Sequence, residues 1–173
     1  MKRYGITSQV RAAMFVAQCA HESDGFRTST EYASGAAYEN RRDLGNTRPG
    51  DGRRFRGRGR IMVTGRANYT RVSQTFGRNF LGDPPGLAAS PWSELASAWW
   101  WTAHGLNEIC DRYDTTESRL RACTRRINGG YNGLDDRRIY LRRAMQVKRS
   151  LVPSSARMRI PPLGAMRPRP SPV

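Results

Sequence analysis

The feature that most constrains the fold of this chain is a long polar stretch, residues 25 to about 60, that interrupts an otherwise helical pattern. It shows no sustained helical period, and turn signals recur at residues 34–35 (SG), 44–46 (LGN) and 49–52 (PGDG). We therefore expect loops there and at most a short hairpin. Because a long irregular segment inside a compact domain is usually functional or disordered, this stretch is the first place to look for a site.

Helical patterns flank this stretch on both sides. A first helix is expected from about Ser8 to Ala20, because Thr7 or Ser8 can cap it and apolar residues follow at helical spacing. His21 and Glu22 then fall on its last turn. Further helices are expected over about residues 67–76, 91–105, 114–127 and 135–148. The sequence thus predicts a mainly α-helical domain with one irregular insertion.

Two of the later helices have distinct start signals. Ser90 and Pro91 are expected to cap and begin the helix that stops at Gly105. Asp114 followed by Glu117 has the spacing of a capping box, which predicts a helix start there.

Positive charge dominates the composition. The 173 residues include 30 Lys+Arg against 14 Asp+Glu, a formal charge of +16. Such a field favours nucleic acid, an anionic membrane surface or an anionic polymer such as a bacterial wall. Residues 151–173 hold six of the ten prolines, four arginines and no acid. We therefore expect a folded catalytic domain over residues 1–150 and a disordered basic tail over residues 151–173.

Several classes of protein are disfavoured. No run approaches the roughly 18 consecutive apolar residues of a membrane span, and the first residues do not resemble an apolar signal region, so neither Sec export nor an anchor is expected. Cys19, Cys110 and Cys123 cannot all pair within one chain. Free, buried thiols in a reducing compartment are favoured, and a Cys110–Cys123 bridge is the alternative. His21 and His104 belong to no ligand cluster, so we expect no metal and no cofactor.

Carboxylates are scarce, and three glutamates lie at or within the irregular stretch. Glu22 ends the first helix, and Glu31 and Glu39 follow it in the loop. One interpretation makes them salt-bridge partners for the surrounding arginines. The other is a pair of carboxyl groups across a cleft, one protonated to donate to a leaving oxygen and one ionised to activate water, as glycoside hydrolysis requires. The residues alone leave both interpretations open.

A series of ordered motifs favours the second interpretation. Residues 20–26 (AHESDGF) resemble the helix-end motif of family 19 glycoside hydrolases, the group that contains plant chitinases and many bacteriophage endolysins. The resemblance covers roughly residues 5–147 and is nearer to the phage endolysin branch than to the plant enzymes. It continues through residues 31–39 (EYASGAAYE), 43–46 (DLGN), 49–52 (PGDG), 57–59 (GRG), 64–69 (TGRANY), 127–130 (INGG) and 136–137 (DR).

The resemblance implies both a fold and a mechanism. The fold is mainly α and similar to lysozyme, a helical domain with a substrate cleft and a small irregular or β lobe. The mechanism inverts the anomeric centre: Glu22 matches the general acid, Glu31 the second carboxylate and Thr64 the hydroxyl residue that holds the attacking water. Glu39 aligns with the second carboxylate of the plant enzymes and stays the alternative to Glu31. Substrate-binding positions of the groove match Asn68, Tyr69, Asn128 and Arg137.

Three other features bear on ligands. Met62 stands where the family usually has a glutamine that contacts substrate, and a thioether cannot donate a hydrogen bond as an amide does. The rings of residues 99–101 (WWW) spread over about 200° of a helix, which assigns one or two of them to the core and leaves another for stacking on a sugar. Residues 53–60 (RRFRGRGR) resemble a nucleic-acid segment, but Phe55 is their only aromatic side chain for stacking, so no specific nucleic-acid partner is expected.

The combined hypothesis is a monomeric endolysin that cleaves β-1,4 glycosidic bonds of peptidoglycan. Peptidoglycan carries carboxylates whereas chitin is neutral, so the charge favours the bacterial wall; a chitinase acting on poly-N-acetylglucosamine is the alternative. A non-catalytic cationic binder of wall or nucleic acid is the third reading. We expect the enzyme to accumulate in the cytoplasm of a bacterial host and to reach the wall after another protein permeabilises the membrane. The basic tail is expected to hold an anionic outer-membrane surface.

Overall fold

The structure is a computed structural model that describes residues 1–147. The tail expected over residues 151–173, and the end of the expected domain at 150, lie outside the described residues. Residues 1–147 form seven α-helices and four short 3-10 helices, and within this range the only β-type pairing is two isolated bridges. No helix in this range is long and apolar enough to cross a membrane. The expected mainly α class is confirmed.

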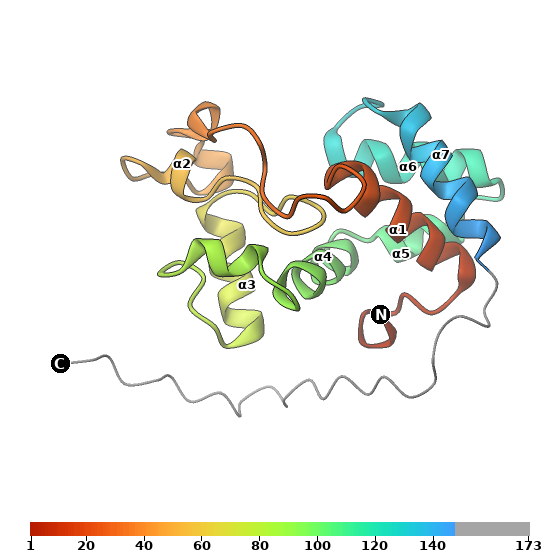
Figure 1. Cartoon of the computed structure of the whole chain (residues 1–173), viewed down its shortest axis with the longest axis horizontal. Coiled ribbons are helices and arrows are strands. Elements are labelled where there is room, and N and C mark those ends of the chain that lie inside the picture. The colour runs from red at the N-terminus through yellow and green to blue at the C-terminus, as the bar shows by residue number, and fades with distance from the viewer. Residues whose placement is uncertain (148–173) are drawn as a thin grey trace.

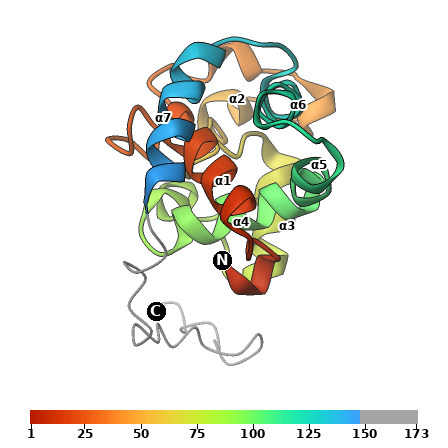
Figure 2. The same ribbon diagram turned by 90° about the vertical axis from the view of Figure 1, so that its right-hand side faces the viewer.

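The larger lobe is built around α1 (Gln9–Glu22), which begins where expected because the Ser8 side chain accepts a hydrogen bond from the Arg11 N–H. Figure 2 shows α1 surrounded by the other helices of this lobe and by α4, all of which contact it. These partners are α4 (Trp92–Ala103), α5 (Leu106–Arg112), α6 (Thr116–Asn128) and α7 (Leu134–Gln146). Their apolar faces enclose one hydrophobic core.

The smaller lobe holds α2 (Asp51–Arg54), α3 (Arg66–Phe76) and most of the irregular stretch (Figure 1). Phe55, Tyr69 and Phe80 are fully buried in a second hydrophobic core. The chain between α1 and α3 contains the short 3-10 helices Ala36–Tyr38 and Arg42–Leu44, with isolated bridges from Arg58 to Thr30 and to Val63. This confirms an irregular lobe with no more than a trace of a hairpin.

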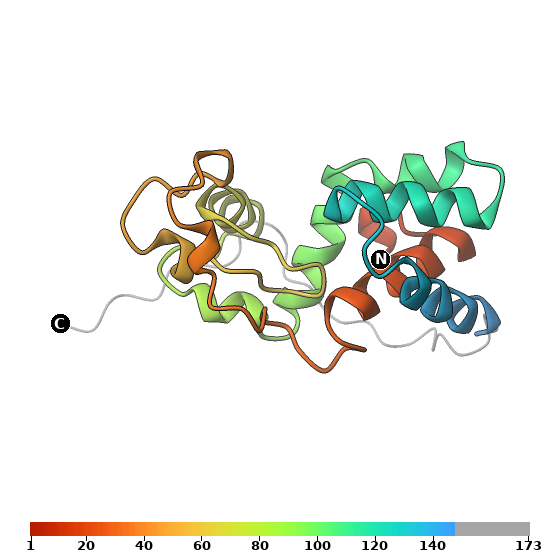
Figure 3. The same ribbon diagram turned by 90° about the horizontal axis from the view of Figure 1, so that it is seen from above.

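Helix α4 lies between the two lobes (Figures 1 and 3). Its Ala98 and Trp101 belong to the core of the larger lobe, whereas Ala96 belongs to that of the smaller lobe and Trp92 packs against it. A single helix therefore fixes how the lobes, and the space between them, are arranged.

The three adjacent tryptophans of α4 all pack on the interior. Trp101 is fully buried, Trp99 packs against the core of the smaller lobe, and Trp100 packs against both cores. The Trp100 ring also stacks on His104, with ring centroids 3.8 Å apart. All three rings contact a core because α4 has hydrophobic cores on both sides, and Trp99 and Trp100 are half-buried.

The helix boundaries differ from expectation in two regions. Gly105, in the left-handed conformation at φ 70°, ends α4 as expected, but the chain enters α5 directly, and the sequence analysis predicts no helix there. The capping box of α6 is formed by Thr115 and Ser118, not by Asp114 and Glu117. The hydroxyl pair satisfies the first N–H groups, so the acidic pair is left outside the cap.

The start of α4 also differs from expectation. The helix begins at Trp92, and Pro91 occupies the N-cap position with no side chain bonded to the first N–H groups. Ser90 therefore does not cap it.

The three cysteines are free and buried. The sulfur atoms of Cys110 and Cys123 lie 3.9 Å apart, well beyond the roughly 2.05 Å of a disulfide bond. The hydrogen bond between them, together with burial, raises the pKa of the Cys123 thiol, and burial raises that of Cys19 well above its ordinary value. The structure confirms the preference for free thiols over the Cys110–Cys123 bridge.

Candidate active site

A cleft of about 750 Å³ lies between the two lobes. It brings together all three residues expected to act in catalysis, Glu22, Glu31 and Thr64. Glu22 comes from the end of α1, and the other two come from the irregular stretch and the turn before α3. The remaining lining residues are His21, Asp24, Arg27, Thr28, Tyr32, Ala33, Tyr38, Ile61, Met62, Ile127, Asp136 and Tyr140.

Glu22 is held in place by a buried arginine on the interior side of the cleft. Its Oε1 atom accepts a hydrogen bond of 2.5 Å from Nη2 of Arg137, a side chain that is only 1% exposed. Arg137 also donates to the buried Gln18, one turn earlier on α1. Among the described residues no group hydrogen-bonds Oε2 of Glu22. One carboxyl oxygen is thus fixed and the other is available to a ligand in the cleft.

Glu31 has a different set of partners. Its Oε1 atom accepts from the Tyr38 hydroxyl at 2.7 Å, and its Oε2 atom accepts from the Gly57 N–H at 3.0 Å. Burial, and then the hydrogen bond to Glu31, raises the pKa of Tyr38 to about 12, so this hydroxyl remains a donor at neutral pH. A carboxylate that accepts a hydrogen bond on each oxygen is held in one orientation, which suits it to position a water molecule.

Gly57 allows Glu31, Met62 and Thr64 to converge. A Cβ atom at this position would lie 3.0 Å from Met62 Cβ, 3.1 Å from Glu31 Oε2 and 3.2 Å from Thr64 Oγ1. The Thr64 hydroxyl donates to the Met62 carbonyl at 2.8 Å, which orients its oxygen beside the carboxylate. Met62 has a φ of 55°, a left-handed conformation that few non-glycine residues adopt. Such outliers cluster at functional sites.

Glu39, the alternative second carboxylate, does not line the cleft. Its two oxygens accept the N–H groups of Gly50 at 2.7 Å and Gly52 at 2.8 Å. It therefore ties its own loop to the start of α2, and the geometry favours Glu31.

The four residues expected to bind substrate do not line this cleft. Arg137 and Tyr69 are buried, and their part in substrate binding stays a prediction. Tyr69 accepts from Arg58 and donates to the Arg56 carbonyl.

The two asparagines hold local backbone. Asn68 donates to the Thr64 carbonyl at 2.8 Å and so fixes the turn that carries the Thr64 hydroxyl. Asn128 is exposed, and its amide bonds the Asn132 carbonyl and the Gly130 N–H.

Two polar pairs at the cleft were not anticipated. Nδ1 of His21 lies 2.7 Å from Oδ2 of Asp136, which joins the end of α1 to the start of α7. Tyr32, an exposed aromatic residue, donates to Asp24 at 2.9 Å. The sequence offers one signal for these pairs: their acids, Asp24 and Asp136, belong to the motifs that resemble family 19. No cluster of metal-ligating side chains occurs within residues 1–147.

Comparison with known proteins decides the family. Residues 5–115 match the family described as chitinase class I. A glycosyl hydrolase family 19 domain-containing protein of Haemophilus influenzae is 30% identical over 169 residues, which cover 79% of this chain and 80% of that protein. The chain belongs to glycoside hydrolase family 19.

Some relatives are longer than this glycoside hydrolase. An endochitinase of Arabidopsis thaliana is 30% identical over 126 residues, 73% of this chain but only 42% of that protein. Among solved structures, a class IV chitinase of Zea mays has a TM-score of 0.62 at 21% identity, covering 86% of this chain and 73% of its own. Chitinase C of Streptomyces griseus has a TM-score of 0.60 at 20% identity, covering 80% and 59%. These similarities show the shared fold.

Proposed function

We propose that this family 19 glycoside hydrolase is an endolysin that cleaves β-1,4 glycosidic bonds of peptidoglycan with inversion. The observation that carries the catalytic part is the pair of carboxyl groups, Glu22 and Glu31, that line one cleft with different partners. An inverting reaction needs such a pair, with one group donating a proton and the other activating water.

The roles follow from the hydrogen bonds of each group. Glu22, as general acid, donates a proton from Oε2 to the leaving glycosidic oxygen, while Arg137 holds Oε1. Glu31, as general base, accepts a proton from the water that attacks the opposite face of the sugar ring, and Tyr38 and Gly57 keep its oxygens oriented. The Thr64 hydroxyl supplies a second contact for this water. The C–O bond to the leaving sugar breaks as the bond to water forms.

The proposed polymer rests on charge. The chain has a formal charge of +16, and peptidoglycan stem peptides carry carboxylates that such a surface attracts. Chitin is neutral and gains nothing from this field. A chitinase acting on poly-N-acetylglucosamine is the second candidate, because the Arabidopsis, maize and Streptomyces relatives are named chitinases.

The catalytic assignment is tested by Glu22→Gln, which keeps the shape of the side chain and removes the transferable proton. Release of reducing ends from peptidoglycan should fall about 10²- to 10⁴-fold, while far-UV circular dichroism should show that the helical fold is retained. The melting temperature should fall, because Arg137 loses its carboxylate partner. Glu108→Gln is the matched control, because Glu108 is exposed on α5 and outside the cleft. A wild-type rate in Glu22→Gln would refute the assignment.

The polymer is tested separately. Wild-type protein is incubated with purified peptidoglycan and with chitin, and reducing ends are counted for both. We expect faster release from peptidoglycan, and mass spectrometry of the reducing-end sugar then identifies the bond that is cut. Faster release from chitin would favour the second candidate.

We also propose that the enzyme accumulates in the cytoplasm of a bacterial host before it reaches the wall. Three buried, unbridged thiols support a reducing compartment. Fractionation of an expressing culture, before and after permeabilisation of the inner membrane, tests this proposal; early activity outside the membrane would contradict it.

A further inference from the structure

Four of the five arginines at residues 53–60 fall into two groups in the structure. Arg58 and Arg60 are engaged by other side chains: the buried Arg58 donates to the Tyr69 hydroxyl at 2.8 Å, and Arg60 donates to the exposed Glu94 at 3.1 Å. Arg53 and Arg54 are exposed and line a second depression. None of the residues that line it also lines the catalytic cleft. Catalysis gives no role to this pair.

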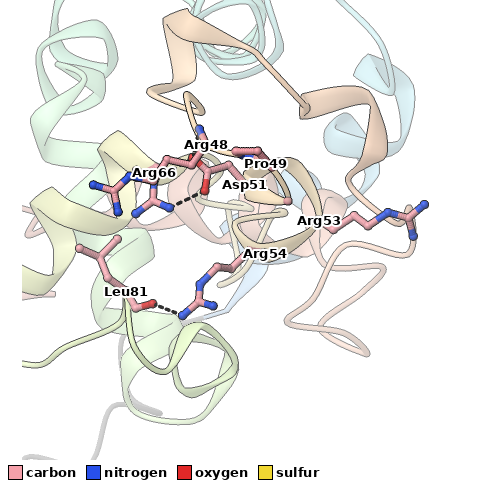
Figure 4. A pocket seen from close by; sticks show the side chains of 8 residues that line it. Arg48, Pro49, Asp51, Arg53, Arg54, Arg66 and Leu81 are labelled. Carbon is pink, nitrogen blue, oxygen red and sulfur yellow. Dashed lines mark hydrogen bonds and ion pairs between the residues drawn. The ribbon is translucent and has the colours of Figure 1, made fainter.

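We call this depression the basic pocket. It has a volume of about 730 Å³ and shares no lining residue with the cleft. In Figure 4, Arg54 reaches the Leu81 carbonyl and Arg66 reaches Asp51, whereas the Arg53 side chain extends away from them. Its lining residues are Arg48, Pro49, Gly50, Asp51, Arg53, Arg54, Arg66 and Leu81.

The only acid in the lining is already engaged. Asp51 is 1% exposed, and it is paired with Arg66 and accepts the N–H groups of Thr47 and Arg48, both at 3.1 Å. The hydrogen bond from Arg66 lowers the pKa of Asp51, so the carboxylate stays ionised and bound. Asp51 therefore neutralises one guanidinium and leaves the others uncompensated.

The other three arginines have no carboxylate partner within residues 1–147. Arg54 donates to the Leu81 carbonyl at 2.9 Å, and the side chains of Arg48 and Arg53 make no hydrogen bond in this range. Glu39 lies beside the pocket, but its oxygens already accept the N–H groups of Gly50 and Gly52. The pocket thus carries four arginines against two nearby carboxylates, Asp51 and Glu39, and its net charge is positive.

Part of this charge is held in place before any ligand arrives. Arg66 is fixed by Asp51, and its guanidinium carbon lies 4.7 Å from the centre of the buried Phe55 ring. Arg54 lies against the same ring at 5.7 Å and is also tied to the Leu81 carbonyl. Because little side-chain entropy remains to be lost, binding of an anion here is favoured.

The geometry favours phosphate over carboxylate. One guanidinium fork satisfies a carboxylate, whereas a phosphate has enough oxygens for several forks that come from different directions. Arg48, Arg54 and Arg66 come from a loop, from α2 and from α3. The volume falls in the range of small-molecule sites, roughly 300–1,000 Å³, and therefore leaves room for a sugar beside the phosphate.

We propose that the basic pocket binds a phosphate ester carried on a saccharide, and that it docks the enzyme on phosphorylated glycans of the bacterial envelope. The envelope as the source rests on the proposed function, whereas phosphate binding does not. Nucleic acid is disfavoured as the ligand because no exposed aromatic residue lines the pocket for base stacking.

The test uses the full-length chain and N-acetylglucosamine 6-phosphate as the probe, with N-acetylglucosamine and inorganic phosphate for comparison. Arg48→Gln/Arg54→Gln removes two charges from the pocket. Arg125→Gln/Arg142→Gln removes two exposed charges from α6 and α7 and is the matched control. Calorimetry should show affinity for the sugar phosphate reduced about tenfold or more in the pocket variant. In the control it should stay within about twofold of wild type.

Three outcomes would overturn the proposal. Equal losses in both double variants would mean that binding follows overall charge. Equal affinity for N-acetylglucosamine and its phosphate would exclude phosphate recognition. Tighter binding of a single-stranded oligonucleotide, lost in the pocket variant alone, would assign the pocket to nucleic acid.

Peptidoglycan cleavage separates this proposal from the proposed function. The pocket variant should release reducing ends from purified peptidoglycan at the wild-type rate, because the pocket and the cleft share no residue. The wild type could fail to cleave peptidoglycan while the pocket variant still shows reduced affinity for the sugar phosphate. In that case the phosphate site stands and only the envelope source is refuted.

Discussion

Arg137 reaches Glu22 from inside the protein: its Nη2 atom donates a hydrogen bond of 2.5 Å to Glu22 Oε1. The same guanidinium donates to Gln18, so it links two successive turns of α1 to α7. The orientation of the proposed general acid therefore depends on a buried residue that does not line the cleft.

This relationship predicts the effect of Arg137→Lys. Lysine keeps the charge but cannot bond Gln18 and Glu22 with one planar group. We expect kcat to fall about tenfold with KM nearly unchanged, since small misplacements of a catalytic group are costly. Steady-state kinetics measures both, and Arg138→Lys, at a surface ion pair, is the matched control. A higher KM at constant kcat would instead indicate sugar contact.

Arg137→Met should lower the free energy of unfolding by about 3 kcal/mol.

The second prediction separates the two candidate bases. Glu31→Gln should reduce turnover about 10²- to 10⁴-fold, because Glu31 lines the cleft. Glu39→Gln should leave turnover nearly intact and lower the free energy of unfolding by about 1 kcal/mol, since one backbone N–H loses its acceptor. Reducing-end assays and urea denaturation measure the two effects. The reverse ranking of turnover would give the role of base to Glu39.

Gly57→Ala is the third test. The new methyl group would press on Glu31, Met62 and Thr64 at 3.0–3.2 Å, so turnover should fall at least about tenfold. Gly130→Ala is the control, because a Cβ there meets nothing closer than 4.0 Å. Equal activity of the two variants would show that the contact around Gly57 does not set the geometry of the site.

The fourth prediction concerns alkaline pH. Burial raises the pKa of Tyr69 to about 12 from an ordinary value of 10.0. The protonated phenol is thus favoured in the folded state, so its contribution to stability is complete below pH 10 and is lost as pH rises toward 12. The free energy of unfolding should fall across this window by on the order of 2 kcal/mol. Urea denaturation at several pH values gives the free energy of unfolding as a function of pH. Between pH 10 and pH 12 this free energy should fall less steeply in Tyr69→Phe than in wild type. It should fall as steeply as in wild type in Tyr113→Phe, where the ring is exposed. Equal slopes in wild type and Tyr69→Phe would contradict the assignment.

The sequence predicts those parts of the fold that depend on local signals. The start of α1 at Ser8 and the irregular lobe follow from capping and turn chemistry, and the catalytic candidates Glu22, Glu31 and Thr64 follow from ordered motifs. Helix α5 was missed because Gly105 both ends one helix and precedes the next. A stop signal says nothing about how soon the chain becomes helical again.

The positions of single side chains were harder to predict. An arginine in a +16 chain is expected at the surface, and Arg137 is buried only because Glu22 and Gln18 on a distant helix receive its hydrogen bonds. Tyr69 is likewise buried by partners in the 56–58 segment. Pairings between residues this far apart in sequence are fixed by tertiary packing, which local periodicity does not report.

The position of α4 in both hydrophobic cores has a thermodynamic consequence. Neither lobe can lose its core without exposing one side of the same helix, because Ala96 and Ala98 face different cores two residues apart. Unfolding of either lobe should therefore cause the other to unfold. Calorimetry should record one transition whose van't Hoff and calorimetric enthalpies agree. The two walls of the cleft then keep their spacing until the whole of this two-lobed domain unfolds.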